Sequence, residues 1–312
     1  MTEQRPIIET KDLTRRFRDL VAVEDLTFSV NRGELFGLVG PDGAGKTTTL
    51  RMLAGVLKPS NGDAILNGIS VVQHPERVKH EIAYMSQRFG LYTDLTVLEN
   101  LHFYADLYQV PKAHRADRIE RLFQFSNLGS FKDRLAGKLS GGMKQKLGLS
   151  CALIHQPNIL LLDEPTFGVD PISRRDLWLI VHDMVAQGMT AVISTAYMDE
   201  AERFDRIAIL QQGHLLTMGK PETLQQGLEG EVIIVRVERV REARDLVAHI
   251  PGIRSVVVFG EQLHVVVPSA ERDGPTVEAA LREEGFSQIE WRVIVPTMED
   301  VFIDHMIGKS SP

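Results

Sequence analysis

A glycine-rich segment with one lysine and one threonine has the spacing of a phosphate-binding loop. Residues 40–47 read Gly-Pro-Asp-Gly-Ala-Gly-Lys-Thr, which fits the pattern Gly-x-x-x-x-Gly-Lys-Thr, and they follow an apolar run at 35–39. The glycines let the backbone curl so that its N–H groups point at phosphate oxygens, and the N-terminus of a following helix adds its positive end. Lys46 is predicted to hold the β- and γ-phosphates of a nucleotide, and Thr47 to place its hydroxyl on Mg²⁺.

Two adjacent acids end a second apolar run. Residues 159–162 are all Ile or Leu, and Asp163 and Glu164 follow them. Charged groups at the end of a buried strand are costly unless they are paired or bound to metal. The sequence therefore predicts that an acid from this strand completes the Mg²⁺ environment that Thr47 begins.

A second anion site is predicted at Ser140, which can cap an apolar helix that runs to Leu153. Gly141 and Gly142 leave the first N–H groups of that helix open to an anion. The chain thus has two anion-binding segments, whereas one nucleotide has a single γ-phosphate. We expect a second copy of the chain, or a relative, to supply the other half of each site.

In combination these motifs resemble those of the ATP-binding subunits of ABC transporters, over roughly the first 225 residues. The resemblance implies an α/β fold with a P-loop ATPase core of the ABC type, an ATPase activity, and ATP with Mg²⁺ as ligands. It implies that Glu164 is the catalytic base, that Gln87 acts with it, and that Thr47, Gln87 and Asp163 surround the metal. The nucleotide-binding residues implied by the resemblance are Phe17, Gly40, Pro41, Asp42, Gly43, Ala44, Gly45, Lys46, Thr47, Thr48, Ser140, Gly141, Gly142, Gln145 and Asp170.

Two of these assignments have plain structural alternatives. Phe17 sits where the family stacks an aromatic ring on adenine, but a single aromatic residue here can also be an edge-strand core residue. Gln87 follows the apolar run 82–85 and precedes a helical block, which suits a hinge that senses Mg²⁺, but it can also be a surface glutamine.

Position 196 departs from the family pattern. The family has a histidine there that contacts the γ-phosphate, and Ala196 has no side-chain donor or acceptor. Tyr197 is not expected to replace it, because alternation along a strand turns its side chain the other way. Ala196 leaves open a slow homodimer, a heterodimer with a more competent ATPase chain, or an engineered substitution. Asp42 stands where the family often has Asn, which we interpret as a mild weakening of nucleotide affinity at most.

A helical insertion is predicted over about 88–150. Thr96 and Glu99 form a capping box, and apolar residues follow at helical spacing: Val97, Leu101, Tyr104, Ala105 and Tyr108. In the family this subdomain carries the ABC signature, which corresponds to residues 139–145 here, and contacts the membrane subunit. Residues 89–98 are therefore the expected coupling surface, and the alternative is that their aromatic side chains pack inside.

A second domain is predicted over 231–312, after an ATPase domain over 1–225 and a polar connector over 225–230. Its strand-like and helical segments follow the order βαββαβ, which suits a small α+β, ferredoxin-like sandwich. The segments are strands at 232–237, 255–259, 263–267 and 289–295, with helices at 242–250 and 276–284. We interpret this domain as an accessory module for dimerisation or regulation, and the ending at 296–302 resembles that of exporter ATPases.

Composition limits the choice of partners. The chain has 312 residues and a formal net charge of −7, and residues 231–312 carry 9 Lys/Arg against 14 Asp/Glu, a net of −5. A nucleic-acid-binding tail should be basic, so we expect no nucleic acid partner. No apolar run reaches the roughly 18–20 residues that span a bilayer. We expect a cytoplasmic protein that is peripheral at the inner face of the cell membrane, and a lone Cys151 that is buried rather than reactive.

Together these features predict an ATP-binding subunit that pairs head to tail with a second ATPase chain, as a homodimer or heterodimer. Its expected membrane partners are separate permease subunits, and export is the expected direction. The alternative is a nucleotide-gated regulatory subunit with weakened catalysis, which Ala196 favours and Glu164 opposes. A soluble relative acting on ribosomes or DNA is a more distant third.

Overall fold

The chain forms two compact units. The structure, a computed structural model, describes residues 5–87 and 90–308. The first unit comprises 1–197 and 204–217, and the second comprises 198–203 and 218–312. The sequence places the division at about 225, whereas this division falls between residues 217 and 218 and assigns the short segment 198–203 to the second unit.

A six-stranded sheet forms the centre of the first unit, in the order β10-β9-β3-β8-β7-β6. Every residue of β3, β7 and β8 is buried, as expected for central strands of a sheet that is covered on both faces. The strands are β3 (Leu35–Val39), β6 (Ile82–Met85), β7 (Ile159–Asp163), β8 (Thr190–Thr195), β9 (Arg206–Gln211) and β10 (His214–Gly219).

The carboxyl ends of four parallel strands meet at one edge of this sheet. Val39 of β3 is in register with Thr195 of β8, and Asp163 of β7 is in register with Ser194. Strand β6 pairs in parallel with β7. The loops that follow these strands therefore emerge side by side, and they carry the predicted site residues.

An antiparallel sheet and several helices surround the central sheet. The strands of this second sheet lie in the order β2-β1-β4-β5. They are β1 (Ile8–Phe17), β2 (Leu20–Val30), β4 (Asn61–Leu66) and β5 (Ile69–Ser70). The helices α1 (Lys46–Leu53), α2 (Pro75–Glu81) and α6 (Pro171–Ala186) connect the strands of the core.

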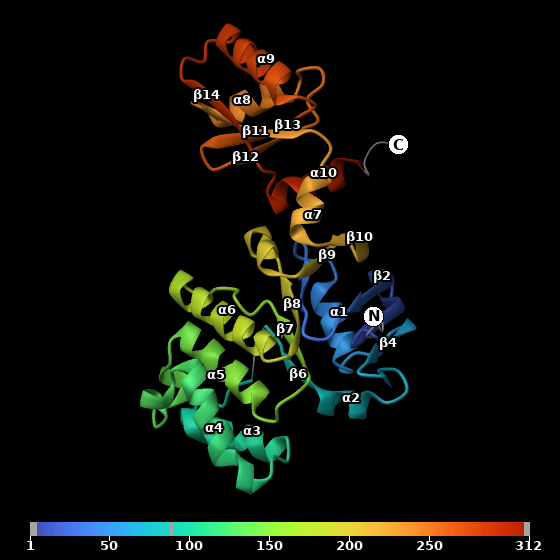
Figure 1. Ribbon diagram of the computed structural model, residues 1–312, viewed down its shortest axis with the longest axis vertical. Coiled ribbons are helices and arrows are strands. Elements are labelled where there is room, and N and C mark those ends of the chain that lie inside the picture. The colour runs from blue at the N-terminus through green and yellow to red at the C-terminus, as the bar shows by residue number, and fades with distance from the viewer. Residues whose placement is uncertain (1–4, 88–89, 309–312) are drawn as a thin grey trace. The chain divides into compact units, whose positions relative to one another are not determined.

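The described part of the predicted helical insertion contains α3, α4 and α5, and Figure 1 shows these helices gathered in green, apart from the blue strands β2 and β4. The capping box at Thr96 and Glu99 is confirmed, with both of its hydrogen bonds formed. The apolar face that follows it is buried at Val97, Leu101 and Tyr104. The elements are α3 (Val97–Leu107), α4 (Lys112–Ser126), two short 3-10 turns η1 (Gly129–Phe131) and η2 (Ala136–Lys138), and α5 (Gly141–Leu153).

The second unit contains the predicted βαββαβ series. Its antiparallel sheet has the order β12-β13-β11-β14, so the first and third strands of the series lie in the middle. This is the strand arrangement of a ferredoxin-like sandwich, which stays our interpretation of the domain. The strands are β11 (Glu231–Val237), β12 (Ser255–Phe259), β13 (Gln262–Val267) and β14 (Ile289–Ile294), and the helices are α8 (Val240–Val247) and α9 (Ala270–Glu283).

Three helical segments differ from the expectation. Helix α9 begins at Ala270 rather than 276 and contains Pro275, because the backbone N–H of Ala270 is satisfied by the Glu231 carboxylate at 2.5 Å and that of Ser269 by Asp273 at 3.0 Å. Helix α7 (Pro221–Gln226) overlaps the predicted connector, and α10 (Met298–Gly308) follows β14. The remaining 3-10 segment is η3 (Met198–Arg203), which packs against α10 and α7 in the second unit.

The core of the second unit lies between one sheet face and the two helices of the series. Ile233 and Val235 of β11 and Leu263 of β13 meet Val247 of α8 and Leu281 of α9, and all five are fully buried. Among the residues that the structure describes, no helix in either unit is both long enough and apolar enough to cross a membrane.

Candidate active site

The glycine-rich loop after β3 is held tightly against neighbouring backbone. Gly45 has a φ of 100°, and a Cβ added to it would lie 2.6 Å from the carbonyl oxygen of Ala22. The N–H of Gly40 donates to the carbonyl of Thr195 at 3.2 Å. A side chain at residue 45 is therefore excluded by both conformation and space. Helix α1 begins at Lys46, directly after this glycine.

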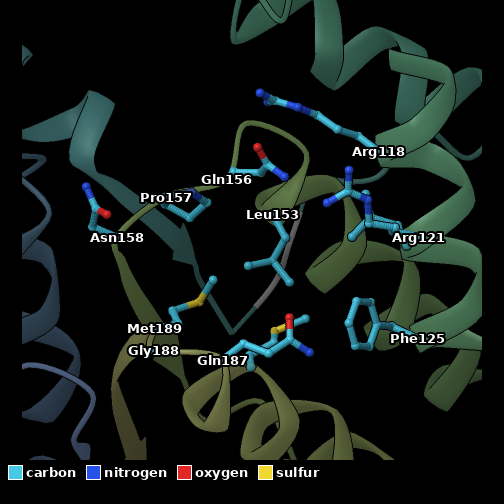
Figure 2. A pocket seen from close by; sticks show the side chains of 12 residues that line it. Arg118, Arg121, Phe125, Leu153, Gln156, Pro157, Asn158, Gln187, Gly188 and Met189 are labelled. Atoms are coloured by element: carbon cyan, nitrogen blue, oxygen red, sulfur yellow. The ribbon is translucent and has the colours of Figure 1, made fainter. Parts of the chain in front are cut away.

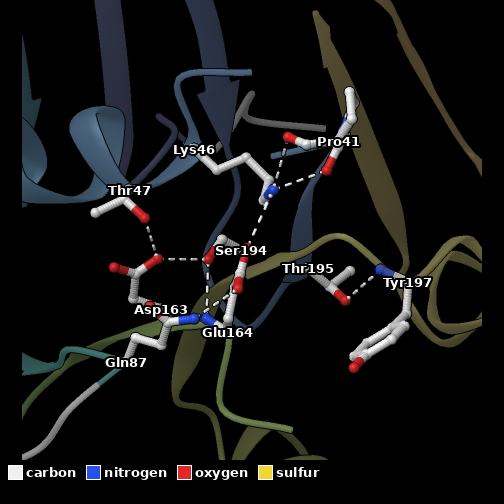
Figure 3. A network of polar contacts seen from close by, with 10 residues as sticks. Pro41, Lys46, Thr47, Gln87, Asp163, Glu164, Ser194, Thr195 and Tyr197 are labelled. Carbon is white, nitrogen blue, oxygen red and sulfur yellow. Dashed lines mark hydrogen bonds and ion pairs between the residues drawn. The ribbon is translucent and has the colours of Figure 1, made fainter. Parts of the chain in front are cut away.

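Lys46 is a buried cation with three oxygen acceptors. Its ammonium donates to the carbonyls of Gly40 at 2.7 Å and Pro41 at 3.0 Å, and it lies 3.1 Å from a carboxylate oxygen of Glu164. The Lys46 side chain is only 4% exposed. A buried charge is tolerated only when it is paired and hydrogen-bonded, so this ammonium is fixed in place by its partners (Figure 3).

Thr47, Asp163 and Ser194 form a second chain of contacts, which Figure 3 shows beside Lys46. The hydroxyls of Thr47 and Ser194 both donate to Oδ1 of Asp163, at 2.9 and 2.8 Å. The other Asp163 oxygen lies 3.5 Å from the hydroxyl of Tyr84. Burial raises the pKa of Tyr84, and the negative charge of Asp163 raises it further.

The donors in this chain suit a hard divalent cation. Hydroxyl and carboxylate oxygens are the ligands that Mg²⁺ prefers, and Mg²⁺ sites use few protein ligands because the ion keeps waters and binds substrate phosphates. Among the described residues, no group of three or more His, Cys, Asp or Glu side chains could hold a metal ion. Thr47 and Asp163 fit a Mg²⁺ site that is shared with a phosphate.

Glu164 is positioned by contacts on both its backbone and its side chain. Its N–H donates to the Ser194 hydroxyl at 3.0 Å, and the Gln87 amide donates to its carboxylate at 3.0 Å. Its backbone is left-handed, with a φ of 47°. A residue other than glycine in this conformation is strained, and such strain clusters at functional sites. The hydrogen bond from Gln87 places this side chain against the predicted base.

One cleft brings most of the predicted nucleotide-binding residues together. It has a volume of about 610 Å³ and is lined by Phe17, residues 42–48, Gln87 and Glu164. Phe17 is 40% exposed, and the Arg15 guanidinium lies 4.4 Å from its ring centre. An exposed ring at the end of β1, beside the phosphate loop, offers a flat surface for a base.

The signature residues lie elsewhere in the chain's own fold. Ser140 caps α5 by accepting a hydrogen bond from the N–H of Met143 at 3.3 Å. Asp170 caps α6 in the same way, and the bond from the Ser173 N–H lowers the pKa of its carboxyl. Gly142 lies where the starts of α5 and α6 pack closely together. A Cβ at this position would lie 2.0 Å from the Ser173 hydroxyl. No signature residue is among the described residues that line the cleft.

Ala196 follows β8 at the edge of the sheet where the other site residues lie. The next residue, Tyr197, donates its N–H to the Thr195 hydroxyl at 3.0 Å, and its ring lies 4.8 Å from the guanidinium carbon of Arg174 on α6. Figure 3 shows the Tyr197 ring pointing away from Lys46 and Glu164. This direction agrees with the expectation that Tyr197 does not take the place of a histidine.

Sequence reasoning missed Ser194. It is fully buried, in register with Asp163, and it contacts both predicted acids. A polar residue that directly follows the apolar run 191–193 is a usable signal, because buried hydroxyls require partners. Tyr84 was missed for a related reason, since only the pairing of β6 with β7 brings its hydroxyl toward Asp163.

The predicted coupling surface at 89–98 is described only in part. Phe89 lies outside the described residues. Tyr92 is 47% exposed, and its backbone N–H and C=O are both bonded to the buried Asn100 side chain at 3.0 Å. This segment is thus fixed to the start of α3 with one aromatic side chain facing out.

A separate cavity of about 280 Å³ lies between α4 and the loop before β7 (Figure 2). Arg118 and Arg121 line one side, and Phe125, Leu153 and Met189 provide apolar surface. Arg118 donates to the carbonyl of Ile154 at 3.0 Å. The cavity contains none of the predicted site residues.

Comparison with known proteins agrees with this geometry. A family model described as ABC transporter matches residues 23–167. The probable multidrug ABC transporter ATP-binding protein YbhF of Escherichia coli is 41% identical over 309 residues, which is 98% of this chain and 53% of that protein. This chain thus spans about half the length of that relative. The Nod factor export ATP-binding protein I of Ralstonia nicotianae is 33% identical over 300 residues, covering 96% of this chain and 93% of that protein.

Solved structures of ATP-binding proteins match the fold over about 70% of this chain. One described as the ATP-binding subunit of an ABC transporter has a TM-score of 0.64 and 31% identity, and covers 70% of this chain and 92% of that one. The ATP-binding cassette MJ1267, in its ADP conformation, has a TM-score of 0.64 and 25% identity with the same coverage.

Proposed function

Because this chain belongs to the ATP-binding proteins of ABC transporters, we propose that it binds and hydrolyses ATP and drives separate membrane subunits that export a substrate. The observation that carries the proposal is the buried set of contacts joining Lys46, Thr47, Asp163 and Glu164 at the carboxyl ends of parallel strands. These groups supply positive charge, metal ligands and a base at one edge of the central sheet.

Binding of the triphosphate falls to the loop at 40–48. Its N–H groups and the start of α1 face the phosphates, and Lys46 contributes the one buried cation of the loop. Phe17 stacks on the adenine ring from the open side of the cleft. Asp42, which lines the same cleft, adds a negative charge near the phosphates and lowers affinity slightly.

Thr47 and Asp163, together with Gln87, would hold Mg²⁺. A bound Mg²⁺ supplies charge neutralisation to the phosphates. Ser194 keeps the Asp163 carboxylate oriented through its 2.8 Å hydrogen bond. Phosphoryl transfer needs positioning and charge neutralisation more than covalent chemistry, and these side chains are already held in place by their contacts.

Glu164 acts as the base toward water. As the water oxygen bonds to the γ-phosphorus and the bond to the ADP oxygen breaks, Glu164 accepts the proton of the water. Gln87 donates to one oxygen of this carboxylate, and Lys46 is paired with the other. A phosphate that binds Lys46 competes with Glu164 for the same ammonium, so substrate binding frees the base for its task.

A second chain completes each site. Ser140, Gly141, Gly142, Gln145 and Asp170 belong to the signature segment and the start of α6, and we propose that they close over the ATP of a partner chain in a head-to-tail dimer. Ser140 is the N-cap of α5, and the N-terminus of a helix is suited to bind a phosphate. The partner is a second copy of this chain or a related ATPase chain.

Ala196 is expected to lower the rate of ATP hydrolysis. Loss of one transition-state hydrogen bond typically costs about 10²–10³ in rate, so we propose a slow ATPase. The alternative of a regulatory chain without useful turnover rests on Ala196 alone, and the contact between Gln87 and Glu164 favours turnover.

The location of the chain and the direction of transport are part of this proposal, and membership of the family supports them. We propose that the chain lies on the cytoplasmic face of the membrane, where it contacts permease subunits through the segment around Tyr92. Export is favoured because one relative is named a Nod factor export ATP-binding protein, and another is named a probable multidrug ABC transporter ATP-binding protein.

The first test is steady-state Mg²⁺-ATP hydrolysis by the purified chain beside two variants. We expect slow turnover, which Glu164→Gln abolishes and Ala196→His raises. Glu76→Gln, on the exposed face of α2, serves as a control with unchanged turnover. A parent that binds ATP without turnover, and that gains none from Ala196→His, contradicts the proposed enzyme.

The head-to-tail arrangement is tested by mixing two inactive variants. Lys46→Ala removes the phosphate-binding cation and Ser140→Arg blocks the signature. A mixed dimer retains one site built from two intact halves, so we expect the mixture to recover up to about a quarter of the parental activity, since half of the random dimers are mixed and each has one of two sites. No recovery above the single variants contradicts the arrangement.

A further inference from the structure

Among the residues that the structure describes, β14 is an outer strand of the sheet in the second unit. This strand is the last in the order β12-β13-β11-β14, and β11 occupies only its inner side. Val293 in the strand is 51% exposed, and Val295 just after it is 77% exposed. An outer strand with exposed β-branched side chains presents backbone donors and acceptors that can pair with another strand.

Two opposite charges lie on one face of this edge. Glu290 and Arg292 are two residues apart, so their side chains project from the same face, and both are exposed. Neither forms an ion pair among the residues that the structure describes. Arg236 lies opposite Glu290 in the register of β11 with β14.

The order of these charges selects one way for the strand to pair with its own copy. A two-fold axis perpendicular to the sheet keeps the helix-covered faces of both copies on the same side. Centring the antiparallel pair on residue 290 places Glu290 opposite Glu290, and centring it on residue 292 places Arg292 opposite Arg292. Centring it on residue 291 places Glu290 opposite Arg292 twice.

We propose that β14 pairs antiparallel with β14 of a second copy of this chain, with Trp291 at the two-fold axis. Opposite charges that face each other across an antiparallel pair are stabilising, whereas like charges are destabilising. The same register places Ile289 opposite Val293 on the helix-covered face, which removes the exposed Val293 from water. The two sheets then form one continuous eight-stranded sheet.

This contact goes beyond the proposed ATP-dependent dimer, because it requires neither nucleotide nor the first unit. Each chain carries both units, so joining the second units raises the local concentration of one ATPase unit near the other. Its test is made without nucleotide, which separates it from the proposed function.

The test is sedimentation velocity of the full chain over a range of concentrations, with no nucleotide present. We expect reversible dimers, and we expect Glu290→Arg and Arg292→Glu each to weaken self-association by at least about tenfold, since each change places like charges opposite one another. Glu261→Arg, an exposed change in the turn between β12 and β13, is the matched control with dimers retained.

Mixing makes the test specific. A Glu290→Arg chain carries two arginines at these positions and an Arg292→Glu chain carries two glutamates, so we expect the mixture to form dimers that neither variant forms alone. The double variant, with both changes, restores self-association. A parent that stays monomeric, or a mixture that behaves like its components, overturns the proposal. In that case the charges serve to keep the edge from pairing.

The register is checked by disulfide formation. An Ile289→Cys chain mixed with a Val293→Cys chain is expected to cross-link, because these positions face each other when Trp291 lies on the axis. A Val293→Cys chain on its own cross-links only if the pair is centred on residue 293 instead of 291. Cross-linking of that variant alone that is faster than cross-linking of the mixture therefore overturns the assigned register. The native Cys151 is fully buried in the first unit and does not interfere.

Discussion

The ammonium of Lys46 lies 3.1 Å from the carboxylate of Glu164, so the predicted phosphate-binding cation and the predicted base neutralise each other. Both side chains are buried, at 4% and 11% exposure. A phosphate that reaches Lys46 must share this ammonium with the carboxylate. Nucleotide binding and activation of the base are therefore coupled through one pair of residues.

We expect Glu164→Gln to bind ATP more tightly than the parent, even though it does not turn over. Removing the carboxylate removes a competitor for Lys46 and a negative charge near the phosphates, and a tenfold gain in affinity corresponds to about 1.4 kcal/mol. Equilibrium binding of a fluorescent ATP analogue measures the change. Glu164→Asp keeps the charge and is the control. Equal affinities for all three proteins would refute the coupling.

Ser194→Ala is expected to lower kcat by about 10–100-fold, the usual cost of losing a group that orients a metal ligand. Ser194 donates to Asp163 at 2.8 Å and accepts from the Glu164 N–H at 3.0 Å, so its loss frees both acids. The readout is the Mg²⁺ concentration needed for half-maximal turnover, which should rise. Ser150→Ala, whose hydroxyl bonds only within α5, is the matched control. An unchanged Mg²⁺ requirement would count against the role.

Gly142→Ala is expected to lower turnover in the dimer while leaving nucleotide binding to the single chain intact. A Cβ there would lie 2.0 Å from the Ser173 hydroxyl, so the contact between the starts of α5 and α6 must open. Gly141 is next in sequence, and a Cβ there meets nothing within 4 Å, which makes Gly141→Ala the comparison for crowding. Turnover and nucleotide binding are measured on both variants. Equal turnover in the two variants would show that crowding is not the cause.

Asp300→Asn is expected to destabilise the second unit at neutral pH by about 2 kcal/mol, the order of a hydrogen bond to a charged group. Burial raises the pKa of Asp300, but hydrogen bonds with His264 and Thr297 outweigh it and leave the pKa below its ordinary value of 3.8. A lowered pKa stabilises the fold above about pH 4, and this stabilisation is lost as the pH falls through the lowered pKa.

The difference between Asp300→Asn and the parent should therefore shrink in acid. Urea unfolding at pH 7 and at about pH 3 measures it, with Trp291 reporting on the second unit in a Trp178→Phe background. Glu299→Gln, the neighbouring acid, serves as the comparison because burial raises its pKa instead. A difference that is independent of pH would contradict the assigned role of the Asp300 charge.

The sequence alone determined the local elements and the kind of chemistry. The apolar runs at 35–39 and 82–85 and the strand predicted at 255–259 form strands with those bounds, because a short apolar run leaves few alternatives. The caps at Thr96 and Ser140 were also predictable, since a capping side chain bonds within three residues along the chain. The phosphate loop was identifiable because its glycines and its lysine lie within one short segment of the sequence.

Contacts between distant segments were decided only by the tertiary structure. Ser194 reaches Asp163 because β8 pairs with β7 in a particular register, and Gln87 reaches Glu164 from the end of β6. Helix α9 starts early because Glu231, 39 residues away, satisfies its first turn. Local secondary structure depends on residues that are neighbours in the sequence. Strand register and packing depend on burial between distant segments, which a single sequence does not specify.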